Sequence, residues 1–438
     1  MKSTKLWAAI IVLSVLMSSC KKEPKATAVS TDDINTFLTS HPNFKPYSKD
    51  LTALYQEHNE HFIWYDGDDR NTLSDVLYDK ASQIQTEGVL VPLPYQEEYD
   101  KLFSKDKGAK PENDLLLSAM YCFYAKKVIA GIDSKQSKRL GWYLPRERVS
   151  YVDYLEELMK DPDLVKKDDD ENISLYYNLR KGLQRYRQMK KSGMTVDAQG
   201  VSIDQRIKTI VVNMERCRWL SPDAIDVPEY IAVNIPSYKM RYVRDGKTAL
   251  ESNVVVGDEA NRTVVFSGKM SYLVFSPYWN IPESIVEKEI NPAIEKDPDY
   301  LEKHNMEWQG KHLRQRPGGD NSLGLIKFMF PNSNNIYLHD TPAKSLFKKE
   351  DRALSHGCVR VQKARDLAVM ILDDDPNWSP EKVDEAMHSG EETQYPLKRK
   401  IPVYIAYFTA TADENGNVEF FDDVYQRDNK LASLLYKL

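Results

Sequence analysis

The spacing of apolar residues changes near residue 209, and this change divides the chain into two parts of different fold class. From about residue 46 to 192 the apolar side chains recur at helical intervals. One such stripe consists of Leu115, Leu116, Ala119, Met120 and Phe123. Beyond residue 209 they alternate, and Asp245-Gly246 and Asn415-Gly416 supply hairpin turns. We therefore expect an α+β protein in which a mainly helical domain precedes a β-rich domain.

The alternating part of the chain contains several strand candidates. They are Tyr230–Val243 with an edge or break at Pro236, Leu250–Val256, Ser271–Phe275, Leu325–Phe330, Asn335–His339, Pro402–Thr411 and Val418–Phe421. Two helices are expected among them, at Glu283–His304 and Gln362–Asp373. The first of these helices lies between strands. Residues 283–316 are therefore expected to form a capping segment over a groove.

Composition and charge exclude several classes of protein. The 438 residues include 60 Lys and Arg against 66 Asp and Glu, and the formal net charge is −6. A hydrophobic content of 41% is too high for a disordered chain. The acidic balance gives no electrostatic footprint for nucleic acid, and four cysteines are too few for a disulfide-stapled scaffold.

The first twenty residues have the pattern of an export signal. Lys2 and Lys5 precede the apolar run Leu6–Met17, which as a helix would span about 18 Å against about 30 Å of bilayer hydrocarbon. Ser18-Ser19-Cys20 resembles a bacterial lipobox, although Met17 stands where Leu is preferred. We expect an exported lipoprotein that is anchored by Cys20 and faces the periplasm. An ordinary cleaved signal with an incidental cysteine is the alternative.

The chemistry of the chain centres on His339 and on the run SHGCVRV, which begins at Ser355. His339 ends an alternating segment in which Ile336 and Leu338 face one side and Tyr337 faces the other side with His339. In a chain of this composition the tripeptide His-Gly-Cys is expected about 0.003 times by chance. The run is therefore a specific signal.

These residue types suit acyl transfer through a thiolate. Cys358 is a good nucleophile near neutral pH if a base such as His339 activates it. Gly357 lets the backbone approach a substrate closely, so that the Cys358 amide can point at a developing oxyanion. Arg360 shares the Cys358 face of an extended segment and suits a substrate carboxylate. Each residue alone is more often structural, a buried thiol or a satisfied polar strand end, but their combination favours catalysis.

The run SHGCVRV resembles the signature of the L,D-transpeptidase (YkuD-type) catalytic domain. The longer run IYLHDTPAKSLFKKEDRALSHGCVRV resembles the YcbB-like periplasmic branch of that family. The resemblance extends to NMERCRWL, SPYWNIPESI, DPDYL, LRQRPGGDNSLGLIKFMFPN and PVYIAYFTA, and so covers nearly all of 206–425. It implies a helical scaffold domain at 46–205 and a catalytic domain at 206–438, which follow the lipoprotein signal peptide at 1–20 and a linker at 21–45 that the residues themselves indicate.

The resemblance also implies a reaction. Cys358 would attack the carbonyl between the third residue and D-Ala of a peptidoglycan tetrapeptide stem, release D-Ala and form a thioester. The side-chain amine of a second stem would then resolve the thioester and cross-link the cell wall, with His339 as the base. No cofactor or metal is implied, and members of the family are acylated by carbapenems. The expected oxyanion and positioning residues are Ser355, His356 and Gly357, and the expected substrate-binding residues are Arg360, Tyr337, Trp279, Arg314 and Arg316.

Several alternatives stay open at the level of sequence. Water in place of the amine would make the protein an L,D-carboxypeptidase, and a dead site would make it a wall-binding scaffold. About a dozen residues join Gly193 to Ile207, too few for the glycan-binding module usual in this branch. A disulfide between Cys122 and Cys217 is weighed against two buried thiols. Oligomeric state, the diamino acid of the stem and the choice of membrane are left undetermined.

Overall fold

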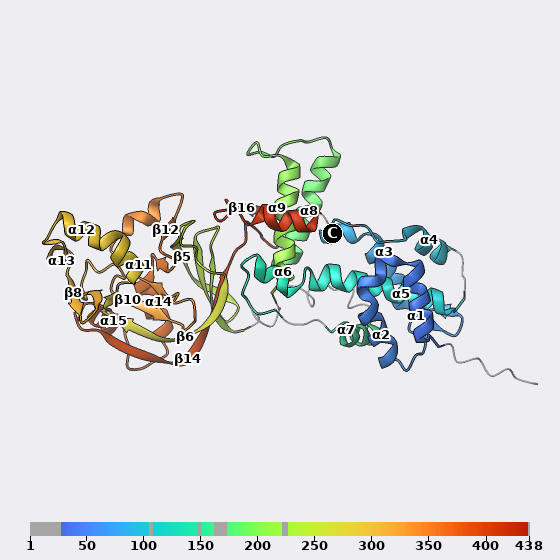
Figure 1. The fold of residues 1–438 in the computed structure, drawn as a ribbon, viewed down its shortest axis with the longest axis horizontal. Helices are drawn as coiled ribbons and strands as arrows, with labels where there is room; N and C mark the ends of the chain where they lie inside the picture. The colour runs from blue at the N-terminus through green and yellow to red at the C-terminus, as the bar shows by residue number, and fades with distance from the viewer. Residues whose placement is uncertain (1–27, 105–107, 147–149, 162–172, 221–226, 437–438) are drawn as a thin grey trace, which may run out of the picture.

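The computed structural model describes residues 28–104, 108–146, 150–161, 173–220 and 227–436. Buried apolar side chains form two large cores in it, one in the helical region and one in the β-rich region. Figure 1 shows the two regions at opposite ends of an elongated molecule, with a helical hairpin between them. The expected α+β class is confirmed. The export signal and Cys20 lie outside the described residues.

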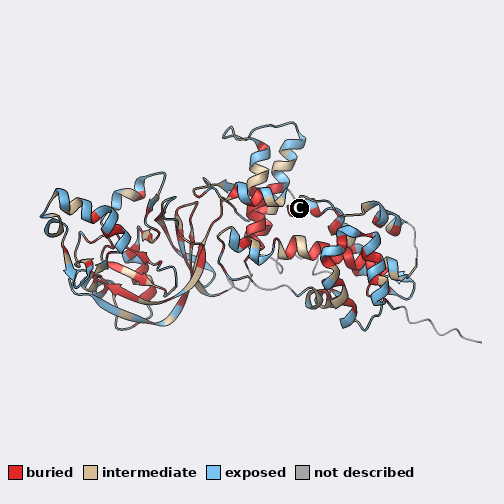
Figure 2. Ribbon diagram, in the orientation of Figure 1, coloured by how far each residue is buried: buried red, intermediate tan, exposed pale blue. Residues whose placement is uncertain are grey.

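The N-terminal region is built from short helices around one long buried helix. The helices are α1 (Thr31–Ser40), η1 (Pro42–Tyr47), α2 (Ser48–Glu57), α3 (Thr72–Ser82), η2 (Ile84–Glu87), α4 (Gln96–Ser104), α5 (Pro111–Tyr124), η3 (Ala125–Ala130), α6 (Ser134–Arg139) and α7 (Tyr151–Lys160). A small hairpin, β1 (Tyr65–Asp66) and β2 (Asp69–Arg70), lies among them. In the described residues, Pro111–Arg139 is long and apolar enough to cross a membrane, but 78% of its most apolar window is buried inside the structure. It is the central helix of the first core (Figure 2).

A buried carboxylate joins this central helix to its neighbours. Asp114 accepts hydrogen bonds from the Tyr55 hydroxyl at 2.6 Å and from the backbone amide of Trp64 at 2.9 Å. Burial raises the pKa of Asp114 to about 6, although these hydrogen bonds oppose the rise. The side chain therefore fixes α2 and the segment before the hairpin against α5.

The helical hairpin belongs with the β-rich core. It consists of α8 (Ser174–Lys191) and α9 (Ile203–Cys217), and its apolar faces pack in the same core as the sheet. Gly182 in α8 lies so close to the tail hairpin that an added Cβ would stand 2.4 Å from a Val418 methyl group. Helix α8 ends before Ser192-Gly193, as the sequence predicts, and α9 begins at Ile203. The predicted boundary at 205/206 stays a prediction, and α8 shares its buried core with the sheet.

The β-rich region is a nine-stranded sheet that curls on itself. Its order is β12-β5-β13-β11-β10-β6-β14-β3-β4, and β4 also pairs with β5. The strands are β3 (Glu229–Asn234), β4 (Lys239–Arg244), β5 (Lys247–Gly257), β6 (Phe266–Phe275), β10 (Ile326–Met329), β11 (Leu338–His339), β12 (Ala353–Ser355), β13 (Val359–Val361) and β14 (Thr393–Ala406). Helices α14 (Ala364–Leu372) and α15 (Pro380–Met387) share its core. The tail adds β15 (Ala410–Ala412), β16 (Val418–Phe420) and α16 (Asp428–Leu435).

The segment between β6 and β10 forms a small unit of its own. It contains β7 (Trp279–Asn280), α11 (Glu283–Ile285), η5 (Val286–Ile290), α12 (Asn291–Lys296), α13 (Tyr300–Lys303), β8 (Met306–Gln309) and β9 (His312–Gln315). Its apolar side chains make a separate cluster. The prediction that Glu283–His304 is helical is confirmed.

Two sequence-predicted strands differ in extent from a single continuous strand. Tyr230–Val243 is broken at Pro236, one of the two expected alternatives, because Pro236 lies in the turn between β3 and β4. Asn335–His339 pairs only at Leu338–His339. Asn332 holds the preceding residues in a turn, since its side-chain amide donates to the Ile336 carbonyl at 2.8 Å, and Asn335 has a φ of +53°.

Candidate active site

Two short parallel strands bring the predicted catalytic residues together. Strand β11 pairs with β13 so that Leu338 opposes Val359 and His339 opposes Arg360. Leu338 and Val359 are buried in the sheet core, so the alternating side chains of both strands point to the opposite face. Cys358 follows the same alternation, one residue before β13. The residues predicted from two separate sequence runs therefore share one face of the sheet.

The thiol of Cys358 rests in its protonated form. Its sulfur lies 3.7 Å from the Asn335 carbonyl oxygen, to which it donates a weak hydrogen bond. Burial raises the pKa of the Cys358 thiol, while hydrogen bonding to Tyr337 and the charges of Lys327 and Arg360 oppose the rise. Within the described part of the chain, the thiol bonds Asn335 and Tyr337 rather than His339. Catalytic hydrogen bonds are often long in the absence of substrate, so this geometry is compatible with His339 as the base.

His339 is set up as a neutral imidazole. Its Nδ1 lies 2.5 Å from the Asp340 carbonyl oxygen, which favours the tautomer with the proton on Nδ1, and the ring also forms a backbone hydrogen bond with Leu323. Burial, together with the charge of Arg360, lowers the pKa of His339 to about 3. The Tyr337 ring packs edge-to-face against the imidazole, with 5.7 Å between the ring centroids. At neutral pH this side chain can accept a proton from a thiol.

Ser355 and Gly357 shape the turn that precedes the nucleophile. The Ser355 hydroxyl donates to the Cys358 carbonyl at 2.6 Å and accepts from the Gly357 amide at 3.2 Å. Gly357 has a φ of +112°, which a residue with a side chain adopts only under strain. Ser355 is buried, so this predicted positioning residue acts on the backbone of the turn rather than on solvent.

Side chains that the sequence does not single out stabilise this turn through hydrogen bonds. The Thr263 hydroxyl donates to the Gly357 carbonyl at 2.8 Å. The Tyr425 hydroxyl donates to the Gly257 carbonyl at 2.6 Å and accepts from the Thr263 amide at 3.1 Å. Gly257 packs so closely that an added Cβ would stand 3.0 Å from the Gly357 Cα. Thr263 has no local sequence signal, whereas Tyr425 stands in the polar run DDVYQRD near the chain end.

His356 contacts the segment between β6 and β10, in which the predicted substrate residues Trp279, Arg314 and Arg316 lie. The His356 Nε2 pairs with Glu289 of η5 at 2.8 Å. Arg314 and Arg316 both pair with Glu307, each at 2.6 Å. Trp279 packs against the apolar cluster of the capping segment. The pairing of His356 joins this segment to the catalytic turn.

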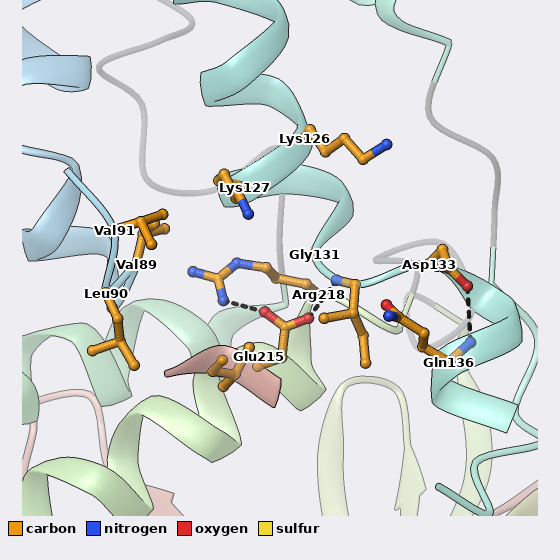
Figure 3. Close-up of a pocket in the computed structure, with 13 residues that line it drawn as sticks. Val89, Leu90, Val91, Lys126, Lys127, Gly131, Asp133, Gln136, Glu215 and Arg218 are labelled. Carbon is orange, nitrogen blue, oxygen red and sulfur yellow. Dashed lines mark hydrogen bonds and ion pairs between the residues drawn. The ribbon is translucent and has the colours of Figure 1, made fainter. Parts of the chain in front are cut away.

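The other two described cysteines, and a cavity between the two cores, lie apart from the Cys358 face. Cys122 and Cys217 are free, buried thiols in different cores, and burial raises the pKa of both. A cavity of about 220 Å³ lies where the scaffold helices meet α9, lined by Lys127, Glu215 and Arg218 among others (Figure 3). None of the Cys358-face residues lines this cavity, so it belongs to the junction between the cores.

Comparison with known families agrees with this geometry. Residues 228–384 match the YkuD family, described as the L,D-transpeptidase catalytic domain, and residues 49–183 match the Scaffold domain. The β-rich part of this chain is an L,D-transpeptidase catalytic domain. The matched range contains His339, Cys358 and Arg360, and the Scaffold match ends inside α8. The L,D-transpeptidase domain thus follows a Scaffold domain, as the sequence predicts.

Relatives of the L,D-transpeptidase domain are found among curated proteins and solved structures. A Haemophilus influenzae protein named "Putative L,D-transpeptidase" is 35% identical over 242 residues, which are 51% of this chain and 48% of that protein. The chain therefore spans about half the length of this curated relative. Among solved structures, an L,D-transpeptidase from Mycobacterium smegmatis is 12% identical, with 41% of this chain and 58% of that chain covered and a TM-score of 0.24. One from Stackebrandtia nassauensis is 15% identical, with 55% and 94% covered and a TM-score of 0.20.

Proposed function

We propose that this protein is a peptidoglycan L,D-transpeptidase that works through a Cys358 thioester. The Cys358 sulfur attacks the carbonyl carbon between the third residue and D-Ala of a tetrapeptide stem. The thiol proton passes through His339 to the departing D-Ala amine, and the C–N bond breaks as the C–S bond forms. The side-chain amine of a second stem then attacks the thioester, loses a proton to His339 and restores the thiol.

The observation that carries this proposal is the register of β11 and β13. It places a neutral imidazole, a thiol and a guanidinium on one face, with the strained Gly357 turn beside them. The Nε of Arg360 is buried and has no hydrogen-bond partner among the residues that the structure describes. A cation left in this state is suited to a substrate carboxylate, which supports the binding of a stem.

Product analysis on defined stems tests the proposal. Purified protein is incubated with disaccharide-tetrapeptides, and the products are identified by mass spectrometry, with the Cys358→Ala protein as the control. Cross-linked dimers that depend on Cys358 support transfer. Tripeptides alone would assign the protein to the carboxypeptidases, and no Cys358-dependent product from any stem would overturn the thioester mechanism.

We also propose that the protein is exported and tethered to a membrane by a lipid on Cys20. The proposal rests on the apolar run and the Ser-Ser-Cys sequence at its end. The Cys20→Ala protein is expected to leave the membrane fraction and to accumulate as a soluble form in the periplasm. Equal membrane partition of both forms would contradict the lipid anchor.

A further inference from the structure

A lysine outside the sequence expectations stands beside the catalytic base. In the sheet, Lys327 of β10 opposes His339 of β11, which in turn opposes Arg360 of β13. The neighbours of Lys327 along its strand, Ile326 and Phe328, are buried in the core. Lys327 therefore points to the same face as the base. Three adjacent strands thus present a row in which the base is flanked by two cations.

Neither cation of this row forms an ion pair with a residue that the structure describes. Among the residues that the structure describes, Lys327 has no ion pair, and its Nζ lies over the Tyr337 ring at 5.1 Å from the centroid. Burial lowers the pKa of Lys327, and the negative charge of the Glu392 carboxylate opposes this effect. Glu392 forms no ion pair with Lys327, and one of its oxygens accepts from the Tyr278 amide at 2.7 Å. Arg360 likewise lacks a carboxylate partner among the described residues.

The free-energy cost of two unpaired cations beside His339 indicates that the site binds an anionic ligand. Partly buried cations without counter-ions are destabilising, and like charges on both sides of a histidine also disfavour its protonation. Two anionic groups on the ligand would relieve both costs at once. A stem that ends in D-Ala supplies one of them, its terminal carboxylate. The second must come from another carboxylate close to the scissile bond.

We propose that Lys327 is a specificity-determining residue that binds a free side-chain carboxylate on the third stem residue. The inference rests on the proposed function and names the donor that the site accepts. This donor is a stem with a diamino-dicarboxylic acid at position three, while Arg360 holds the terminal carboxylate. Some stems lack a free side-chain carboxylate at position three, either because it is amidated or because the residue is lysine, whose side chain ends in an amine alone. Such stems leave Lys327 unpaired and bind more weakly.

Binding measurements on the full chain test this proposal separately from turnover. The Cys358→Ala protein is titrated by calorimetry with a tetrapeptide containing meso-diaminopimelic acid, with the same peptide amidated at the side-chain carboxylate, and with the lysine peptide. We expect the free-carboxylate peptide to bind about 10- to 100-fold more tightly than the other two. In the same Cys358→Ala background, Lys327→Met should abolish this preference by lowering the affinity for the free-carboxylate peptide alone. Lys327→Arg should retain the preference. Lys269→Met, the same exchange at an exposed position of β6, is the matched control and should also retain it.

The outcomes separate the inference from the proposed function. A Lys327→Met protein that keeps the full preference, or that weakens all three peptides equally, overturns the specificity role. The first result would show that another group reads the carboxylate, and the second that Lys327 acts on the fold or on the general potential. Absence of any preference in the Cys358→Ala protein overturns it as well. If the preference depends on Lys327 but the wild type gives no product from any stem, the inference stands and the proposed reaction fails.

Discussion

Cys358 and His339 rest as an uncharged pair, and this state has a consequence for the pH dependence of acylation. Burial lowers the pKa of His339 to about 3 and raises that of the Cys358 thiol above its ordinary value. Between these limits the thiol is protonated and the imidazole is neutral, so the reactive form is fully populated. We expect the rate of Cys358 acylation by a carbapenem to be constant from about pH 5 to 8, measured by intact mass against time.

Removal of the base should change the shape of that profile. In His339→Ala the thiolate has to form by ionisation into solvent. Acylation should therefore become slower and rise about tenfold per pH unit below the thiol pKa. An inflection near pH 6.5 in the wild type would indicate an ordinary histidine and contradict the neutral pair. An adduct on Cys122 or Cys217 would remove Cys358 from the chemistry.

For individual residues, the sequence predicts which side chains share a face of a strand wherever this follows from the alternation within one run. The shared face of Tyr337 and His339, and of Cys358 and Arg360, follows from the period of two within each run. The position of Lys327 does not, because it depends on the pairing of β10 with β11. Pairing between strands is set by long-range packing, which a single sequence does not display.

Among the elements, the loop before Cys358 depends on the C-terminal tail. Through its hydroxyl, Tyr425 bonds both the Gly257 carbonyl and the Thr263 amide, and Thr263 in turn holds the Gly357 carbonyl. Tyr425→Phe should therefore loosen the turn that presents the oxyanion site. Loss of two buried hydrogen bonds predicts acylation by a carbapenem about 10-fold slower, measured by intact mass.

A second electrophile distinguishes this effect from general loss of the fold. Alkylation by iodoacetamide is a displacement at saturated carbon and forms no oxyanion, so Tyr425→Phe should leave its rate at Cys358 unchanged. Tyr395→Phe is the matched control, because it also removes a hydroxyl hydrogen bond, to Asp375, away from the turn. If Tyr425→Phe slows both reagents equally, the tail acts on the thiol and not on the oxyanion site.

Element prediction succeeded where periodicity is long and failed where a side chain decides the backbone. The helices of the first region and the hairpins at Asp245-Gly246 and Asn415-Gly416 follow from spacing and turn residues. The turn before β11 depends on hydrogen bonds that the Asn332 side chain makes with the backbone of Ile336. At Pro236, the sequence is compatible with either an edge strand or a break. Such decisions rest on tertiary contacts, which outweigh local propensity.

For the whole molecule, one buried arginine joins the two cores. Arg218 follows α9 and donates to the Val128 carbonyl at 2.8 Å and to the Glu87 carbonyl at 2.5 Å, both on scaffold helices. It also pairs with Glu215 of α9 at 2.9 Å, and both side chains are buried. Glu215 in turn accepts from the Ile132 amide at 2.7 Å. Figure 3 shows the pair at the centre of the junction.

This pair makes the stability of the protein dependent on the junction. Arg218→Met keeps most of the side-chain volume but leaves the Glu215 carboxylate buried without its cation and two scaffold carbonyls without a donor. The free energy of unfolding should fall by about 3–5 kcal/mol, measured by urea denaturation followed by tryptophan fluorescence. The matched control is Arg365→Met, which breaks a solvent-exposed pair with Asp384 and should leave the free energy of unfolding nearly unchanged. Equal losses in the two variants would show that the Arg218–Glu215 pair contributes no more to stability than a surface pair.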